Sequence, residues 1–457
     1  MAPRDLVQRL DGTGRIHGST ATFGAPFYGD IVFGRLSWGE SRGNHHCSKD
    51  DYDLQGVDRS LRGDGGNGGL INIVLVHRGT CAFTKKVHVA SAKGAHAVII
   101  VDRNDSQLTS ADMDRIIVTD DGYGGDIHIP SILVPKEEGE QLIDAARGGE
   151  VVVELKWDLP ANHVVELDLW MSSSSHESQK FLKEFSHRRK VLNEVVRFRP
   201  HYDVFALPDS DPGVYQDLCT DASGSYCTKD PDGSGAVTGR DVLEEDVRQL
   251  CIHELTKAPR TSVTDLAAGK PMVEYAEKFW DYVERFGEAC PLDGRSEETR
   301  FGTPCAERLM KSVGLDVPKV QECVATTKER KLLEERKNVA WSPHAVRING
   351  WRYSGRMDAD LVTRAICSGF IDQPNECQDL LRPRDPFEKY AGAPAGPSGV
   401  SAGTMIATFL VLVLIAGVVA LLYKRSLRKQ MRVAVREEVM LEVQSQLASY
   451  SKLSAGI

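Results

Sequence analysis

The sequence predicts an α+β protein with two globular domains followed by a single transmembrane helix. Runs of β-branched residues separated by glycine-rich turns dominate residues 16–157, strands and helices alternate in residues 161–380, and residues 404–422 are apolar and uncharged. A chain of 457 residues is also too long for one hydrophobic core. We therefore expect at least two packed units ahead of the apolar run.

The composition excludes a nucleic-acid-binding protein. The formal net charge is -9 and the pI is about 5.9, so no general excess of Lys and Arg is available to neutralise phosphates. We therefore expect no nucleic acid among the partners.

The cysteines predict disulfide bonds and an oxidising compartment. There are 10, and spacings such as Cys219 to Cys227 and Cys367 to Cys377 fit short disulfide loops better than zinc sites. All of them precede the apolar run, and the pattern leaves their pairing open. The candidates are Cys47, Cys81, Cys219, Cys227, Cys251, Cys290, Cys305, Cys323, Cys367 and Cys377.

The first block, residues 16–157, is predicted to be rich in strands. Only Ala82–Gly94 has a clearly helical pattern. The sequon Asn104-Asp105-Ser106 is a candidate glycosylation site in a luminal domain. The expected strands are Ile31–Phe33, Ile71–Val76, Val98–Val101, Ile129–Val134 and Val151–Leu155.

Three segments of this block resemble the protease-associated domain. In order along the chain, Val74–Lys86 supplies a strand and an Arg-Gly-x-Cys-x-Phe turn, Ala90–Asp102 an Ala-Lys-Gly-Ala turn and a strand, and Ile129–Val134 an Ile-Pro-Ser strand. Near the start, Thr22–Gly29 is similar to the cargo-binding loop that this domain carries in plant vacuolar sorting receptors. The resemblance implies a luminal domain that binds a sorting peptide.

The same resemblance makes Arg78 the first candidate for cargo binding. Its guanidinium is always charged and presents a planar fork to carboxylates or carbonyls, and a loop with Gly24 and Pro26 can present backbone groups to an extended peptide. The alternative is that Arg78 holds the fold by bonding to loop carbonyls. The full predicted set is Arg78, Phe23, Gly24, Ala25, Pro26, Gly79 and Phe83.

His77, next to Arg78, motivates a hypothesis about pH. The family carries acidic residues where His77 and Thr80 stand here, so the local charge is more positive. Imidazole gains a proton as compartments acidify, and this proton would weaken cargo binding. The alternative is a solvated histidine without this role.

The second block, residues 161–380, resembles a thioredoxin-like fold with a helical, cysteine-rich insert at about residues 217–336. Ser342-Pro343 stands where that fold places a cis proline before its third strand. Pieces of the insert, including Phe279–Phe286 and Lys311–Lys319, are similar to the central region of vacuolar sorting receptors. The expected elements are strands His163–Trp170 and Tyr202–Leu207, a helix Ser178–Arg197, a hairpin Val346–Tyr353 that turns at Asn349-Gly350, and a helix Asp358–Phe370.

The sequence does not predict an enzyme. Ser172–Ser178 occupies the place of the CxxC motif of thioredoxin-like enzymes, and hydroxyl groups cannot form a mixed disulfide. Two GxSxG matches and one GxGxxG match lack the strand and helix context that each motif requires. We expect no cofactor and no metal. The spacing from Asp230 to Asp241 leaves calcium as the alternative to an acidic turn.

Residues 404–422 are predicted to cross the membrane. About 19 uncharged residues at 1.5 Å each span roughly 28 Å, close to the thickness of the hydrocarbon core. A basic cluster follows, whereas residues 390–403 are neutral, so the tail of residues 423–457 is expected in the cytosol. This type I topology requires a signal peptide. Residues 1–16 have no apolar region, so we expect the given chain to lack its true start.

The linker and the tail complete the comparison with the family. Members usually carry calcium-binding EGF-like repeats before the membrane, whereas this chain has only the linker of residues 383–403. In the tail, Tyr450 and Leu453 form a YxxΦ signal that can bind a clathrin adaptor as an extended strand. The surrounding Glu442–Leu453 is similar to the family's sorting signal.

These features predict a sorting receptor of the Golgi, trans-Golgi network and prevacuolar compartment. Its expected partners are soluble cargo proteins with vacuolar sorting peptides, a clathrin adaptor of coated vesicles, the membrane, and as a further candidate a second copy of the chain. The alternatives are a membrane-anchored luminal thioredoxin-like folding or redox factor, and the substrate-binding subunit of a protease. The absence of a dithiol argues against redox activity.

Overall fold

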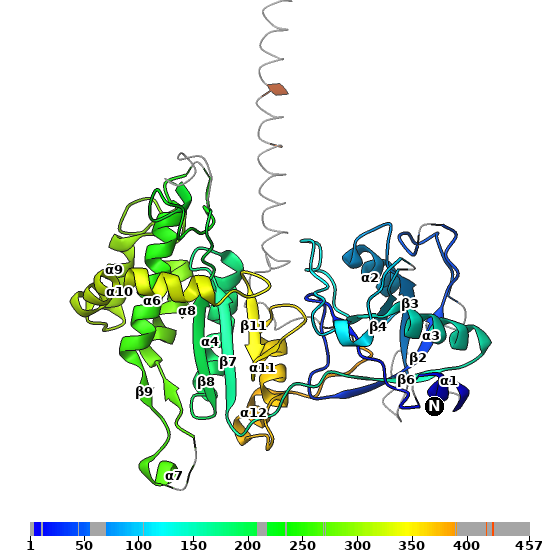
Figure 1. Cartoon of the computed structure of the whole chain (residues 1–457). Helices are drawn as coiled ribbons and strands as arrows, with labels where there is room; N and C mark the ends of the chain where they lie inside the picture. The colour runs from blue at the N-terminus through cyan, green and yellow to red at the C-terminus, as the bar shows by residue number, and fades with distance from the viewer. Residues whose placement is uncertain are drawn as a thin grey trace, which may run out of the picture. The chain divides into compact units, whose positions relative to one another are not determined.

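The computed structural model describes residues 4–390, apart from 11, 44, 55–69, 104, 208–216, 234, 268, 270 and 389, together with the isolated positions 417, 423 and 424. Residues 1–393 form one compact unit, and residues 394–457 are a second unit. The first unit contains two α+β domains, each built around its own sheet (Figure 1). The predicted mixed fold class is therefore confirmed for these domains.

The N-terminal domain contains a six-stranded sheet in the order β1-β5-β4-β3-β2-β6. β2, β3, β4 and β5 pair in parallel, while β1 and β6 pair antiparallel at the two edges. The strands are β1 (Ser19–Thr20), β2 (Ile31–Trp38), β3 (Ile71–His77), β4 (Ala97–Val101), β5 (Ser131–Val134) and β6 (Val152–Lys156). The helices are α1 (Arg4–Arg9), α2 (Phe83–Ala92) and α3 (Lys136–Gly148), with a 3-10 turn η1 (Ser110–Asp112).

Both faces of this sheet are covered, because α2 and α3 pack on opposite sides. Along β3, Val74 and Val76 belong to the same apolar cluster as Val87 of α2, whereas Ile73 belongs with Ile143 of α3. Side chains alternate between the faces of a strand, so a strand that is covered on both sides is apolar throughout. This arrangement explains the continuous β-branched runs of the sequence.

The predicted strands of this domain are confirmed, but the prediction of a single clear helix is wrong. Lys136–Gly148 forms α3. Its sequence has charged or polar residues at most positions, and it buries Gly139, Leu142 and Ile143. Three buried positions in 13 residues give too weak an apolar stripe to identify the helix without the sheet that it covers.

The second domain contains a four-stranded sheet in the order β12-β11-β7-β8. β7 and β8 are parallel, and β11 is antiparallel to β7. The strands are β7 (Val165–Met171), β8 (Val196–Tyr202), β11 (Ala345–Ile348) and β12 (Trp351–Arg352), with a small separate pair β9 (Ala258–Pro259) and β10 (Glu274–Tyr275). The helices are α4 (His176–Val191), α6 (Gly239–Thr256), α7 (Val263–Ala267), α8 (Glu277–Ala289), α9 (Thr303–Ser312), α10 (Val317–Lys337), α11 (Ala359–Ser368) and α12 (Asn375–Leu380).

Two predicted boundaries in this domain are wrong. The helix after β7 ends at Val191, and the next strand is β8, at Val196–Tyr202 instead of Tyr202–Leu207. Val196 continues the four-residue spacing of the helix, which made the helix look longer. In the fold, the alternating burial along β8 shows a strand that pairs with β7 along its whole length.

The hairpin prediction is confirmed, and the cis-proline prediction is wrong. Asn349 and Gly350 have positive φ values of 51° and 78°, as a two-residue hairpin turn between β11 and β12 requires. Among the described residues, which include Pro343, no peptide bond is cis. The trans form is the default for a bond before proline, and the sequence motif alone does not override that preference.

The described residues contain five disulfides and no free cysteine, so the predicted disulfide bonding is confirmed. One disulfide lies in the N-terminal domain and the others lie in the second domain. The pairs are Cys47–Cys81, Cys219–Cys227, Cys251–Cys323, Cys290–Cys305 and Cys367–Cys377.

Several predictions fall outside the described residues. They concern the glycosylation site at Asn104, the apolar run of residues 404–422 except Gly417, and the tail residues Tyr450 and Leu453. Within the part of the chain that the structure describes, no helix has the length and apolarity that a bilayer crossing needs.

Candidate ligand-binding site

The turn between β3 and α2 carries Arg78 and is held at several points. The Arg78 amide donates to the carbonyl of Val101 at 2.8 Å, and the disulfide between Cys47 and Cys81 closes the turn. Gly79 and Thr80 have φ values of 118° and 68°, in the region that favours glycine. This corner, residues 77–83, is a rigid platform at the start of α2.

The Arg78 side chain is both paired and accessible. One Nη donates to Oδ1 of Asp102 at 3.0 Å, and the guanidinium carbon lies 5.5 Å from the ring centre of Phe83. The Asp102 side chain is fully buried, whereas 33% of the Arg78 side chain is exposed. Arg78 therefore stabilises the fold through a carboxylate, not through the loop carbonyls of the alternative, and still presents cationic surface.

The predicted cargo loop is buried. Phe23 and Ala25 are 1% exposed, and Gly24 has a φ of 75° with its Cα so close to Ile129 that a Cβ would lie 2.2 Å from that residue's carbonyl oxygen. Pro26 is buried as well. These four positions are therefore packed against other parts of the chain.

The carbonyl groups of this loop accept hydrogen bonds from residues after the second domain's sheet. The amide of Arg356 donates to Gly24, and the two Nη groups of Arg384 donate to Pro26 and Ala25, each at 2.8 Å. The Arg384 guanidinium also lies 3.7 Å from the ring centre of Phe27. Arg356 and Arg384 thus occupy backbone acceptors of the loop that the sequence assigned to a peptide.

A third loop, residues 119–126, connects the two parts of the predicted site. Thr84 of α2 donates to the Asp121 carboxylate at 2.7 Å, and Gly124 packs on Phe23 so tightly that a Cβ would approach it to 2.6 Å. Tyr123, at the tip of this loop, is 81% exposed. The sequence analysis did not identify this loop.

His77 is partly exposed and has a partner within the domain. Its Nε2 lies 3.0 Å from a carboxylate oxygen of Glu140, and its ring packs edge-on against Trp38 at 4.9 Å. Behind it, His46 is fully buried and takes the amide hydrogen of His77 on Nδ1. Its Nε2 lies 2.8 Å from the carbonyl of Gly39 and donates to it.

His46 is a buried titratable residue that the sequence analysis missed. Burial, as the main cause, lowers the pKa of His46 to about 4. The two hydrogen bonds of the ring fit the neutral form, with Nδ1 as acceptor and Nε2 as donor. The only signal in the sequence was the pair His45-His46 beside Cys47.

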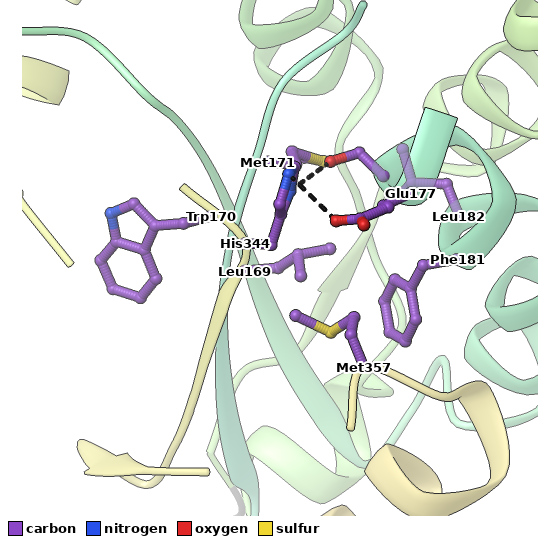
Figure 2. A pocket seen from close by; sticks show the side chains of 9 residues that line it. Leu169, Trp170, Met171, Glu177, Phe181, Leu182, His344 and Met357 are labelled. Carbon is purple, nitrogen blue, oxygen red and sulfur yellow. Dashed lines mark hydrogen bonds and ion pairs between the residues drawn. The ribbon is translucent and has the colours of Figure 1, made fainter. Parts of the chain in front are cut away.

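The second domain has a comparable corner between β7 and α4. Ser175 caps α4 and accepts the amide hydrogen of Ser178. The imidazole of His344 lies against both serines, with Nδ1 2.9 Å from Oγ of Ser178 and Nε2 3.2 Å from Oγ of Ser175. Two hydroxyls of the Ser172–Ser178 segment thus contact one imidazole, and Figure 2 shows that imidazole next to Glu177.

A small pocket opens beside this imidazole. Figure 2 shows apolar side chains of β7 and α4 and Met357 around it, with Glu177 at the edge. Burial, as the main cause, lowers the pKa of His344. The pocket is lined by Leu169, Trp170, Met171, Glu177, Ser178, Phe181, Leu182, His344 and Met357.

The acidic loop considered for calcium uses its carboxylates internally. Asp230 accepts from the amides of Asp232 and Gly233, and Asp241 accepts from Thr238 in the cap of α6. Among residues whose structure is described, no three His, Cys, Asp or Glu side chains are grouped as a metal site.

Comparisons with known proteins identify both domains. A model of the PA domain matches residues 29–142, and a model of the vacuolar sorting receptor thioredoxin-like domain matches residues 165–367. The chain is a relative of the vacuolar-sorting receptors. Both resemblances inferred from the sequence are thereby confirmed.

The vacuolar-sorting receptors that the chain resembles include plant proteins. Vacuolar-sorting receptor 1 of Pisum sativum is 31% identical over 78% of this chain and 57% of its own length. Vacuolar-sorting receptor 4 of Arabidopsis thaliana is 31% identical over 78% of this chain and 59% of its own length. The chain thus spans less than two thirds of these receptors.

Similarity to solved structures is weaker. DsbA from Mycobacterium tuberculosis is 14% identical, with a TM-score of 0.28, over 49% of this chain and 92% of that one. This similarity is too low to support a conclusion about the function of the chain.

Proposed function

We propose that the chain is a sorting receptor that binds soluble cargo proteins in the secretory lumen through its PA domain. In this proposal, residues 404–422 cross the membrane once and the tail recruits a clathrin adaptor through Tyr450 and Leu453. The receptor works between the Golgi and a prevacuolar compartment. The names of the relatives and the match to both receptor domains support this assignment.

The observation that carries the proposal is the rigid, partly exposed arginine at the β3–α2 corner. A disulfide, a backbone hydrogen bond and an ion pair with Asp102 fix the position of Arg78. A guanidinium held in this way loses little conformational entropy when it binds a carboxylate or a peptide carbonyl. The corner therefore suits recognition of an extended peptide.

In this proposal, the burial of the Phe23–Pro26 loop sets the order in which cargo contacts the two parts of the site. Phe23–Pro26 is closed by Arg356 and Arg384, whereas Arg78 and Phe83 are partly exposed. In the proposal, cargo first contacts Arg78 and Phe83. Contact with the backbone of Phe23–Pro26 then requires that Arg384 withdraws from the carbonyl groups.

Retention of secretory proteins by the purified full chain, at neutral and acidic pH, tests the binding role. We expect Arg78→Met to lower retention at least tenfold, because the guanidinium is lost. Arg78→Lys keeps the positive charge next to Asp102 but lacks the planar guanidinium. This variant therefore separates a folding defect from the loss of the guanidinium. The matched control is Arg103→Met, an exposed arginine nearby that pairs with Asp105. Unchanged retention in Arg78→Met would overturn the site.

Accessibility of the two ends of the chain tests the topology. In sealed vesicles from cells expressing the full chain, we expect protease added outside to remove the tail epitope and leave the PA domain intact. Equal protection of both ends would contradict a single membrane crossing.

A further inference from the structure

The sheet of the second domain has an apolar face and a charged face. Figure 2 shows Trp170 of β7 on the side of the strand that is turned away from Leu169. Asp168, two positions before Trp170 on the same strand, lies on the same side as that ring. Asp168 pairs with Arg347 of β11, and Arg347 pairs with Arg352 of β12. Residues that are directly opposite in a sheet share a face, so these two arginines also lie on the charged face.

Three carboxylates of the charged face are paired with cations of β8. These carboxylates belong to Glu166, Asp168 and Glu335. Arg199 forms ion pairs with Glu166 at 2.9 Å and with Asp168 at 2.7 Å, and Arg197 forms a longer pair with Glu166. The ring of His201 lies 3.2 Å from Glu335. Burial lowers the pKa of His201, but hydrogen bonds to Asp168 and Glu335 outweigh it and raise this pKa to about 9, so the ring is cationic at neutral pH.

Arg347 is held by aromatic rings instead of a carboxylate. Its guanidinium carbon lies 4.7 Å from the ring centre of Trp170 and 5.7 Å from that of Trp341. Its side chain is partly exposed, and within the described part of the chain it forms no hydrogen bond and no ion pair. The N–H donors of a guanidinium lie in the plane of the group, so contacts with aromatic rings do not use them. Arg347 therefore presents its donors to a ligand.

Arg352 brings a second positive charge to the same place. It is directly opposite Arg347 in the hairpin, and its guanidinium carbon lies 6.0 Å from the ring centre of Trp341. Its hydrogen bonds go to neutral acceptors, the carbonyl oxygen of Ile116 at 2.8 Å and a serine hydroxyl. In the described part of the chain, Asp114 attracts it through space but forms no ion pair with it. Like charges that are directly opposite in a sheet repel each other, and here no carboxylate lies between them.

The surroundings of the two arginines indicate what kind of anion fits between them. The cations of β8 balance the three carboxylates, so the charges of Arg347 and Arg352 remain without a counter-charge on this face. A carboxylate accepts two parallel hydrogen bonds from a guanidinium. Val339, two positions before Trp341, is 67% exposed and adds apolar surface beside the cations. A carboxylate that is carried next to an apolar group therefore fits this surface better than an inorganic anion.

We propose that Arg347 and Arg352 bind an aspartate or glutamate side chain of a partner protein, and that an apolar residue next to that side chain packs on Trp341 and Val339. A protein is the favoured source of the carboxylate, because Trp and Arg are the residues that contribute most to binding at protein interfaces. The bound carboxylate also removes the repulsion across the hairpin. This inference goes beyond the proposed function, since recognition of cargo at Arg78 does not require it.

Binding of the purified full chain to an immobilised peptide tests the site. The probe is Gly-Ser-Glu-Leu-Ser-Gly with both ends capped, so that glutamate is its only charge. We expect the peptide with Gln in place of Glu, and the peptide with Gly in place of Leu, each to bind at least fivefold more weakly. Inorganic phosphate and acetate should displace the probe no better than chloride at the same ionic strength. Equal binding of the Gln peptide, or displacement by phosphate or acetate alone, would overturn the inference.

Two substitutions of arginine form a matched pair. Arg347→Met removes the charge and the donors while it keeps an apolar side chain beside Trp341, and should weaken peptide binding at least fivefold. Arg330→Met removes an exposed arginine of the same domain that pairs with Glu334, and should leave binding unchanged. Arg347→Lys keeps the charge without the planar donors and should bind with intermediate strength. Thermal unfolding verifies that the variants fold, and equal binding by folded Arg347→Met would contradict the site.

Arg78→Met separates this inference from the proposed function. Binding of the glutamate peptide should persist in that variant, because the two sites lie in different domains. Loss of peptide binding in Arg78→Met would place the peptide at the PA corner and overturn the inference. If the peptide does not bind while secretory proteins are still retained through Arg78, only the site at Arg347 is wrong. If the peptide binds through Arg347 and retention does not depend on Arg78, the proposed PA site is wrong and the site at Arg347 stands.

Discussion

The two domains use the same local geometry with different side-chain chemistry. In each, a buried parallel strand runs into a short turn at the start of a helix: β3 into α2, and β7 into α4. The PA corner is fixed by a disulfide and an ion pair and presents Arg78. The thioredoxin-like corner is fixed by hydrogen bonds of Ser175, Ser178 and His344 and presents an apolar pocket.

The two corners are held in place by different interactions. A covalent link closes the turn at Arg78, where a buried carboxylate on Asp102 must be matched by charge. Near His344 the polar groups are hydroxyls and an imidazole, which satisfy one another without formal charge. We therefore expect the PA corner to respond to reduction more strongly than the other corner.

Removing the disulfide of the PA corner should have the largest effect. Cys47 and Cys81 are separated by 34 positions, and a link of that length stabilises by about 4 kcal/mol in the chain-entropy model. We expect Cys47→Ser with Cys81→Ser to lower hydrogen-exchange protection of α2 by that amount. The control removes Cys219 and Cys227, whose link lies in the other domain. Equal loss in both variants would show that the corner does not depend on its own disulfide.

Removing Arg384 should open the buried loop. Arg384→Ala leaves two carbonyl groups of the loop without donors, and hydrogen bonds from a charged group contribute about 1.5 kcal/mol each, so the cost is about 3 kcal/mol. We expect faster proteolysis within residues 22–29 and stronger cargo retention. Arg382→Ala, an exposed neighbour, is the control. Faster proteolysis with unchanged retention would limit cargo binding to the Arg78 corner.

Acidification should weaken the PA domain through His46. The pKa of His46 is lowered from 6.5 to about 4, so below pH 6.5 the unfolded state binds the proton first and stability falls as the pH falls. From pH 6.5 to 5 the loss is about 2 kcal/mol. Hydrogen-exchange protection of β3, measured at pH 7 and pH 5, should fall accordingly. His46→Asn should remove most of this dependence, and a dependence that persists would contradict the assignment.

His201 in the second domain should change the pH dependence of stability in the opposite direction. Hydrogen bonds to Asp168 and Glu335 outweigh burial, the largest single cause, and raise the pKa of His201 from 6.5 to about 9. Its contribution to stability is complete below pH 6.5 and is lost as the pH rises towards 9. Protection of β8 should therefore decrease between pH 7 and pH 9 and show no loss from this residue on acidification. A loss on acidification that His201→Gln abolishes would reverse the assignment.

The smallest effect is expected at the cap of α4. Ser175→Ala removes the side chain that accepts the Ser178 amide, and loss of such a cap costs about 1 kcal/mol. The control is Ser174→Ala, which should change stability by less than about 0.5 kcal/mol. Chemical denaturation of the full chain, followed by a far-ultraviolet signal and by α4 protection, measures both. Equal effects would show that Ser175 does not hold this corner.

Local patterns in the sequence predicted the strands of the PA domain and the hairpin at Asn349-Gly350. Each of these depends on residues that are neighbours in the chain: a continuous β-branched run, or two residues that tolerate positive φ. The motif around Arg78 is local for the same reason, and it led to the correct domain. The helix α3 and the strand β8 were missed because their periodicity is weak or ambiguous until the neighbouring strands are in place.

The tertiary structure alone decided which polar groups form hydrogen bonds with one another. Arg384 lies 358 positions from Pro26, and His344 lies 166 positions from Ser178. Contacts over such separations leave no periodic pattern in the sequence, because they depend on where whole elements pack. The sequence therefore determined the two domains, and it identified Arg78 and the Ser172–Ser178 segment. Only the packed chain decided that the cargo loop is covered, that His46 is buried, and that a pocket lies beside His344.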